Sequence, residues 1–73
     1  MAPKPSIEQR LAKRLRALRA EMGLSQMDLV RDHGWNLSHY QKLERGVIDP
    51  KLTTLVRLAK DFGVTLAEML KDF

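Results

Sequence analysis

Cysteine is absent from this sequence of 73 residues, and no run of consecutive apolar residues is longer than two. Without cysteine the chain can form neither a disulfide framework nor a metal site built on thiolates, and nothing favours an oxidising compartment. Apolar runs this short predict neither a secretory signal nor a membrane span. We therefore expect a cytoplasmic protein with no membrane partner.

The sequence also lacks a set of residues suited to catalysis. Its two histidines, His33 and His39, lie on different predicted elements, and neither a cysteine nor paired carboxylates in an obvious cleft accompany them. The glycines fall at helix ends, so none forms a loop that cradles phosphate. We therefore predict that the protein is not an enzyme and has no metal site, no cofactor and no small-molecule ligand.

Positive charge is in excess, with a formal net charge of +4. The first 20 residues hold Lys4, Arg10, Lys13, Arg14, Arg16 and Arg19 against the single acid Glu8. A concentrated basic segment favours a polyanion, which is usually nucleic acid when the rest of the chain is compact and has no membrane-binding signature. The charge alone is explained equally well by a solvated helix face.

Helix-capping residues recur along the chain and predict five helices in one all-α domain. The N-cap candidates are Ser6, Ser25, Asn36, Asp49 and Thr65, and Gly23, Gly34, Gly46 and Gly63 fall just past helix ends. The helices are expected at roughly residues 7–22, 26–32, 37–45, 50–62 and 66–71. Residues 1–6, with prolines at positions 3 and 5, are expected to form a flexible arm, and residues 7–73 a single domain.

Apolar residues at helical spacing predict which faces are buried. The first helix has the stripe Ile7, Leu11, Leu15, Leu18 and Met22, and the fourth has Leu52, Leu55, Val56, Ala59 and Phe62. The fifth helix and the residues after it carry Leu66, Met69, Leu70 and Phe73, a cluster that a chain this short cannot fully bury alone. We expect this cluster to join two copies as a homodimer through the C-terminal helices.

The segment from Leu24 to Gly46 is typical of a helix-turn-helix. Ser25 precedes one short helix, with Asp28 placed to complete its cap, and Asn36 precedes another. Gly34 closes the first of these helices in a left-handed conformation, and the connection is only about three residues long. The second helix therefore projects as a reader of the DNA major groove must.

The third helix has faces of different character. Tyr40 and Leu43 share one face and should pack inward with Trp35. The remaining positions are Leu37, Ser38, Gln41, Lys42 and Arg45. Lys42 can donate to guanine, Ser38 can bind several bases, and Leu37 can cover a thymine methyl group. A phosphate contact or a solvated charge explains Lys42 equally well.

From about Ile7 to Leu70 the sequence resembles the phage repressor and Cro-like regulators, also called XRE-type helix-turn-helix proteins. The matching residues are Leu18-Arg19, Gly23-Leu24-Ser25-Gln26, Leu29, Gly34, Leu43-Glu44-Arg45-Gly46, Pro50, Leu55, Leu58-Ala59 and Gly63-Val64. The resemblance implies a compact, five-helix, lambda-repressor-like DNA-binding domain whose second and third helices form the helix-turn-helix.

The resemblance also implies roles for particular residues. The base-reading positions correspond to Leu37, Ser38 and Lys42, with Gln41 alongside. Gln26 corresponds to a glutamine that binds a DNA phosphate and braces the reading helix. Arg19 and Glu44 correspond to a structural ion pair between the first and third helices. We expect further phosphate contacts from Asn36, Arg45 and Lys51.

The expected function is a sequence-specific transcriptional regulator, either a repressor or an activator, that binds double-stranded DNA as a dimer on a short palindromic operator. Such a protein would work on the nucleoid of a prokaryote or be encoded by a phage. The alternative is a protein-interaction module of the same fold, like an antitoxin or a bridging factor, which grips a partner protein. This alternative predicts an apolar outer face on the third helix, and only Leu37 contributes to such a face.

Four positions depart from the family pattern. Val30 stands where alanine is preferred, so the helices of the motif cannot approach as closely. Leu37 is apolar where a polar residue is usual. His33 replaces an aliphatic residue and Trp35 a smaller one. We expect the indole to fill the volume that an outward-turned His33 leaves.

Overall fold

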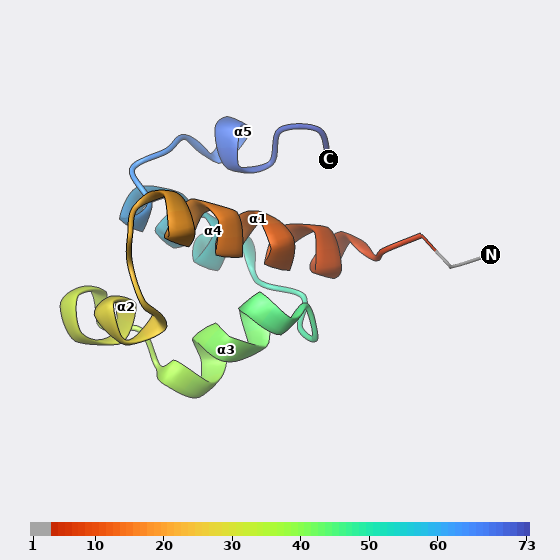
Figure 1. Ribbon diagram of the computed structural model, residues 1–73. Coiled ribbons are helices and arrows are strands. Elements are labelled where there is room, and N and C mark those ends of the chain that lie inside the picture. Colours follow the sequence, from red (N-terminus) through yellow and green to blue (C-terminus); the bar gives the residue numbers. More distant parts are fainter. Residues whose placement is uncertain (1–3) are drawn as a thin grey trace.

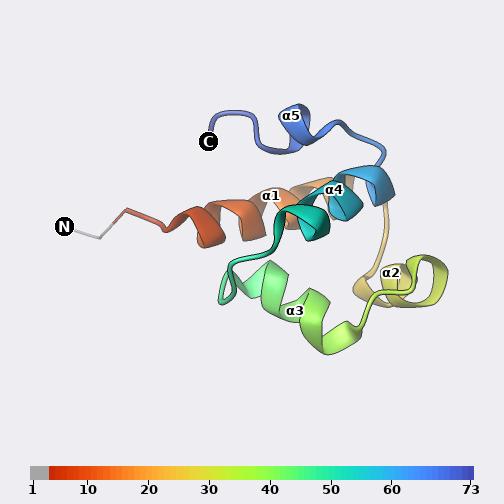
Figure 2. The ribbon, with the colours of Figure 1, turned by 180° about the vertical axis from the view of Figure 1, so that it is seen from behind.

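Helices make up the regular structure of residues 4–73, the part of the chain that the computed structural model describes. They are α1 (Ile7–Glu21), α2 (Gln26–His33), α3 (Leu37–Arg45), α4 (Leu52–Asp61) and α5 (Leu66–Met69). No strand occurs in this range, which confirms the all-α prediction. Helices α1 and α4 lie in the middle, with α3 on one side of them and α5 on the opposite side (Figures 1 and 2).

The helix starts follow the capping residues at four of the five expected positions. Ser6, Ser25 and Thr65 each form a complete capping box with the residue three positions on. The Asn36 side chain accepts from the amide of His39 at 2.9 Å. These bonds satisfy amides of the first turn that have no partner within the helix.

The expected cap at Asp49 is wrong. Helix α4 begins two residues later than predicted, at Leu52, with Lys51 at the N-cap and no side-chain bond there. Asp49, Pro50 and Lys51 all lie before the first helical turn, so Pro50 does not occupy the first helical position. The backbone is still extended at Lys51, with ψ of 156°. At the other end of the chain, α5 stops at Met69 rather than near residue 71.

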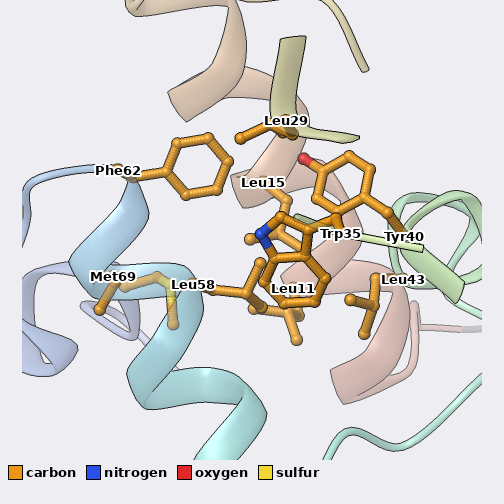
Figure 3. Packing of buried hydrophobic residues seen from close by; sticks show 10 residues of the cluster. Leu11, Leu15, Leu29, Trp35, Tyr40, Leu43, Leu58, Phe62 and Met69 are labelled. Carbon is orange, nitrogen blue, oxygen red and sulfur yellow. The ribbon is translucent and has the colours of Figure 1, made fainter. Parts of the chain in front are cut away.

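The hydrophobic core draws on all five helices and on the turn between α2 and α3. It consists of Leu11, Leu15, Leu29, Trp35, Tyr40, Leu43, Leu58, Ala59, Phe62 and Met69. Figure 3 shows the Trp35 indole among the leucine side chains of this core. His33 stays at the surface while Trp35 is only 2% exposed, so the indole supplies the volume in the interior.

Several residues of the predicted apolar stripes are exposed instead. Ile7 and Met22, at the two ends of the α1 stripe, have exposed fractions of 66% and 47%. On α4 the inner face is Leu55, Leu58, Ala59 and Phe62, at the spacing of a single helix face. Leu52 and Val56 lie beside that face and are 67% and 52% exposed.

The C-terminal cluster is largely packed within its own chain. Met69 is fully buried, and Leu66 and Leu70 pack against the core. Phe73 is the most exposed of the four, at 42%, and lies under the guanidinium group of Arg10, 4.9 Å from its ring centre. The chain itself therefore buries Met69, while Leu66 and Leu70 stay half-buried and Phe73 stays exposed, so part of the cluster remains for a second copy to cover.

Candidate nucleic-acid interface

Helices α2 and α3 are joined by a sharp turn of three residues, Gly34, Trp35 and Asn36. Gly34 ends α2 in the left-handed conformation with φ of 72°, which costs glycine little. Trp35 anchors the turn in the core, where its ring meets that of Tyr40 edge-on with centres 5.7 Å apart. The turn therefore has a fixed conformation, and it sets the direction in which α3 leaves it.

Helix α3 has one buried and one exposed face. Tyr40, Leu43 and Glu44 are buried, while Leu37 is half-buried. Besides His39, the exposed residues are Ser38, Gln41, Lys42 and Arg45, at intervals of three, one and three residues. Side chains at this spacing share one helix face. We call these four residues the outer face of α3. The structure thus brings three of the four expected base-reading side chains together, with Leu37 at their margin.

The expected phosphate-binding residues are in different environments. Arg45 and Lys51 are exposed, and no hydrogen bond or ion pair joins either side chain to another among residues 4–73. Asn36 is exposed, but its side-chain oxygen is occupied by the α3 cap. Lys4 is exposed, whereas residues 1–3 of the expected arm lie outside the described residues.

Gln26 is engaged within the protein. Its Nε2 donates to Glu44 Oε1 at 3.1 Å, and its Oε1 accepts a longer bond, 3.4 Å, from Gln41 on the outer face of α3. A glutamine amide has two N–H groups, so one remains for another acceptor. Gln26 therefore connects the start of α2 both to the buried end of α3 and to its exposed face.

Arg19 and Glu44 form a bidentate ion pair between α1 and α3. Arg19 Nε lies 2.7 Å from Glu44 Oε2, and Arg19 Nη2 lies 3.0 Å from Oε1. Arg19 also donates to the carbonyl of Leu24 at 3.0 Å, and Arg16 donates to the Glu44 carbonyl at the end of α3. The Glu44 side chain is only 3% exposed, so this pair fixes α3 from inside the protein.

Burial and hydrogen bonding act in opposite directions on the ion pair. Burial disfavours the charged form of Glu44, but its polar neighbours, of which Arg19 has the largest effect, outweigh burial and hold the pKa of this carboxyl below its usual value. The hydrogen bond to Glu44 raises the pKa of Arg19. Both groups are therefore charged near neutral pH, and the pair is a structural one.

The Tyr40 hydroxyl lies next to this pair. It is buried and forms no hydrogen bond of acceptable geometry within the described part of the chain. Burial raises the pKa of Tyr40 far above its ordinary value, so the phenol stays neutral. Its ring fills the core, while its hydroxyl contributes no bond.

A second polar cluster joins the turn of the motif to α4, and the sequence did not predict it. Trp35 Nε1 donates to Asp61 Oδ2 at 2.7 Å, and His33 Nδ1 lies 3.3 Å from Asp61 Oδ1. Arg57 stacks on the indole, 3.9 Å from its centre, and donates to the His33 carbonyl at 2.8 Å. A buried indole requires an acceptor, which was the one available signal, but the sequence does not say which residue provides it.

The basic residues of α1 do not form a single surface. Arg16 and Arg19 turn toward α3. Arg10 and Arg14 instead donate to the carbonyls of Asp72 and Lys71, on the side of the molecule that faces the C-terminal segment. The amino-terminal charge that suggested nucleic acid is therefore divided between two sides of α1.

No group of three or more potential metal-ligating side chains occurs within residues 4–73. In the same range, no helix has the length and apolar character that crossing a membrane requires.

Comparison with known proteins shows which family the domain resembles. A family model described as a helix-turn-helix domain matches residues 10–71. The chain is 36% identical over 61 residues to the cryptic phage CTXphi transcriptional repressor RstR of Vibrio cholerae, covering 84% of this chain and 55% of that protein. It is 37% identical over 62 residues to the HTH-type transcriptional regulator DdrOP3 of Deinococcus deserti, covering 85% and 48%. The chain thus spans about half the length of these curated relatives.

Solved structures agree with this placement. The clp gene regulator ClgR of Corynebacterium glutamicum superposes with a TM-score of 0.86 at 26% identity, covering 96% of this chain and 90% of that one. The hypothetical transcription factor NHTF of Neisseria gives a TM-score of 0.80 at 26% identity, covering 96% and 84%. Both are regulators of transcription by name, not enzymes. The chain therefore belongs to the helix-turn-helix domain family, and within it to the phage-repressor and Cro-like (XRE-type) regulators.

Proposed function

We propose that this protein binds double-stranded DNA in a sequence-specific manner and regulates transcription, with α3 in the major groove. The observation that carries the proposal is the outer face of α3, where Ser38, Gln41 and Lys42 are exposed together while Tyr40 and Leu43 on the opposite face are buried. Polar side chains on one face of a projecting helix are what base reading requires.

Each residue of this face has a chemical role in the proposal. Lys42 donates to guanine O6 and N7, Ser38 bonds to base edges, and Gln41 offers an amide that both donates and accepts. Leu37, at the margin of the face, covers a thymine methyl group. Around this face, phosphates are bound by Arg45, Lys51, the free amide of Asn36 and the remaining N–H of Gln26.

The interior contacts support reading by a rigid helix. Glu44 holds α3 through Arg19 of α1, and Gln26 holds it through α2. Because the ordering cost of these contacts has been met during folding, α3 can bind DNA without first becoming ordered. A flexible recognition helix would lose part of its binding free energy to the entropy cost of becoming ordered on DNA.

We further propose that two copies bind a short palindromic operator, with reading helices about 34 Å apart, and that the protein is a repressor. The name of the Vibrio cholerae relative supports repression. A mainly apolar groove of about 240 Å³ beside α5 provides surface for pairing; it is lined by Ile7, Leu11, Pro50, Leu55, Leu70 and Phe73, with Glu8 and Asp49 also at its border. Sedimentation that detects only monomer at high concentration, with and without operator, would rule out the dimer.

The test is selection of bound duplexes from a randomised DNA pool at near-physiological salt, followed by sequencing. We expect a two-fold symmetric motif with half-sites about one helical turn apart. The triple variant Ser38→Ala/Gln41→Ala/Lys42→Ala should give no motif, whereas Lys60→Ala, which changes an exposed side chain of α4, should give the wild-type motif. Binding without any enriched sequence would contradict the proposal and favour a module that grips a partner protein.

A further inference from the structure

A second polar surface lies between the outer side of α1 and the C-terminal segment, residues 71–73. It is a groove of about 490 Å³, which we call the C-terminal groove. Its walls carry the cations Arg10, Lys13, Arg14 and Lys71, the aromatic ring of Phe73 and a single acidic residue, Asp72. A concave site of this size is within the range that proteins use for ligands and short peptide segments.

The positive charge of the C-terminal groove is not neutralised within residues 4–73. Arg10 and Arg14 donate to backbone carbonyls, of Asp72 and Lys71, which carry no net charge. No carboxylate lies within ion-pair distance of Lys13 or Lys71 in this part of the chain. The carbonyl bonds fix the two guanidinium groups in place, so the groove presents positioned cations rather than freely moving ones.

The position of the C-terminal groove separates it from the proposed DNA interface. Helix α3 lies on one side of α1, and the C-terminal segment lies on the other (Figures 1 and 2). A duplex that holds α3 in its major groove therefore cannot reach these cations. They remain available while DNA is bound, and DNA binding does not account for them.

We propose that the C-terminal groove is a docking site for an acidic peptide segment of a partner protein. Carboxylates of such a segment would pair with Arg10, Arg14 and the two lysines, and arginine binds carboxylate in bidentate geometry. Phe73 and Ala17 add apolar wall that receives aliphatic side chains of a peptide. A rigid duplex carries its phosphates on a convex surface that does not enter a groove between α1 and a chain segment.

The proposed docking of a partner at this groove does not depend on the proposed DNA binding, so an experiment can contradict either proposal without contradicting the other. The probe is a fluorescein-labelled eight-residue peptide of alternating glutamate and leucine, followed by fluorescence anisotropy without DNA. The test variant is Lys13→Glu/Lys71→Glu, since neither lysine side chain takes part in a hydrogen bond or ion pair of the fold. The matched charge control is Lys51→Glu/Lys60→Glu, whose exposed lysines lie outside the groove.

We expect the peptide to bind the wild-type protein, and the groove variant to bind it about tenfold more weakly or worse. The control should stay within about twofold of wild type, and a peptide with glutamine in place of glutamate should not bind. Equal losses in both double variants would show that only net charge matters, and would overturn the proposal. So would absence of peptide binding to the wild type, or a loss of duplex binding in the groove variant as large as that of Lys42→Ala.

Discussion

The indole N–H of Trp35 donates to a carboxylate oxygen of Asp61 at 2.7 Å, and this bond joins the turn of the helix-turn-helix to the last residue of α4. Arg57, one helical turn before Asp61, lies over the same indole. Helix α4 therefore braces the turn from behind. The beginning of α3 is held in position by α4, and the end of α3 is held by the Arg19–Glu44 pair.

Asp61→Ala should destabilise the protein by about 1 to 3 kcal/mol, because it leaves a buried indole donor without an acceptor. Urea unfolding followed by circular dichroism measures the loss. Asp32→Ala is the control, since Asp32 is exposed and pairs only with Arg31 at the surface, a kind of pair that contributes about 0 to 1 kcal/mol. Equal losses in the two variants would mean that the Trp35 bond contributes nothing.

Gly46→Ala should be far more damaging than Gly63→Ala. Both glycines have positive φ, 70° and 67°, so an added side chain costs about 1 to 2 kcal/mol at either position. At Gly46 the new Cβ would also lie 2.9 Å from the Cα of Gln9, whereas nothing lies within 4 Å at Gly63. We expect about 2 kcal/mol of additional loss at Gly46 from this backbone clash. Comparable melting temperatures for the two variants would contradict the close approach of α1 to the end of α3.

Glu44→Ala should cost about 3 to 5 kcal/mol of stability, because it leaves the charge of Arg19 without its buried partner. For a domain this small, such a loss is a large part of the whole, and the variant should be unfolded or close to it at 37 °C. Thermal unfolding followed by circular dichroism is the measurement. An unchanged melting temperature would show that the pair does not hold α3.

The same carboxyl predicts how stability depends on pH. The pKa of Glu44 is lowered in the folded protein from its ordinary value of 4.5. The stabilisation is therefore complete above about pH 4.5 and is lost as the pH falls through the lower folded value. Melting temperature measured from about pH 7 to pH 2.5 should show this decline.

Glu44→Gln should flatten that profile without abolishing it. The pKa of Asp28 is lowered too, first by the backbone hydrogen bond from Ser25, and this group loses its contribution in the same direction as the pH falls. The variant should therefore be less stable at neutral pH and less sensitive to acid. A profile as steep as that of the wild type would assign the acid sensitivity to other groups.

Tyr40→Phe should change stability by less than about 1 kcal/mol. The hydroxyl is buried without a hydrogen bond, so removing it takes away an unsatisfied polar group and leaves the ring packing intact. Chemical denaturation compares the variant with Tyr40→Ala, which removes the ring and should cost about 3 to 5 kcal/mol. A large loss in Tyr40→Phe would reveal that the hydroxyl bonds to the Arg19–Glu44 pair.

Features that depend on residues close together in the sequence were predicted well. The caps at Ser6, Ser25, Asn36 and Thr65 lie where local hydrogen bonding places them, and this gave the helix order and the turn of the motif. The one failed cap is at Asp49, which with Pro50 has the local pattern of a helix start, although α4 begins only at Leu52. Helical spacing alone also placed Tyr40 and Leu43 inside and Ser38, Gln41, Lys42 and Arg45 outside, but it did not predict that Glu44 is buried or that Leu37 is half-buried.

Contacts between distant segments were not predictable in the same way. Spacing tells which residues of α1 share a direction, but not that Arg10 and Arg14 would meet the C-terminal carbonyls while Arg16 and Arg19 meet α3. For the Arg19–Glu44 pair the resemblance supplied the partner. No resemblance supplied Asp61 as the acceptor for Trp35, because the indole itself departs from the family pattern.

Lys42→Ala should leave the fold intact and weaken operator binding more than binding to random DNA. The Lys42 side chain is exposed and forms no ion pair within the domain, so the melting temperature of the variant should match that of the wild type. If Lys42 bonds to guanine, the loss on the operator is about 1 to 3 kcal/mol, with a smaller loss on random duplex. Titrations at several salt concentrations separate the two cases, because removing a phosphate contact lowers the salt dependence of binding on every sequence by about one unit of slope. Equal losses on both duplexes would therefore assign Lys42 to the backbone, and sequence reading would then rest on Ser38, Gln41 and Leu37.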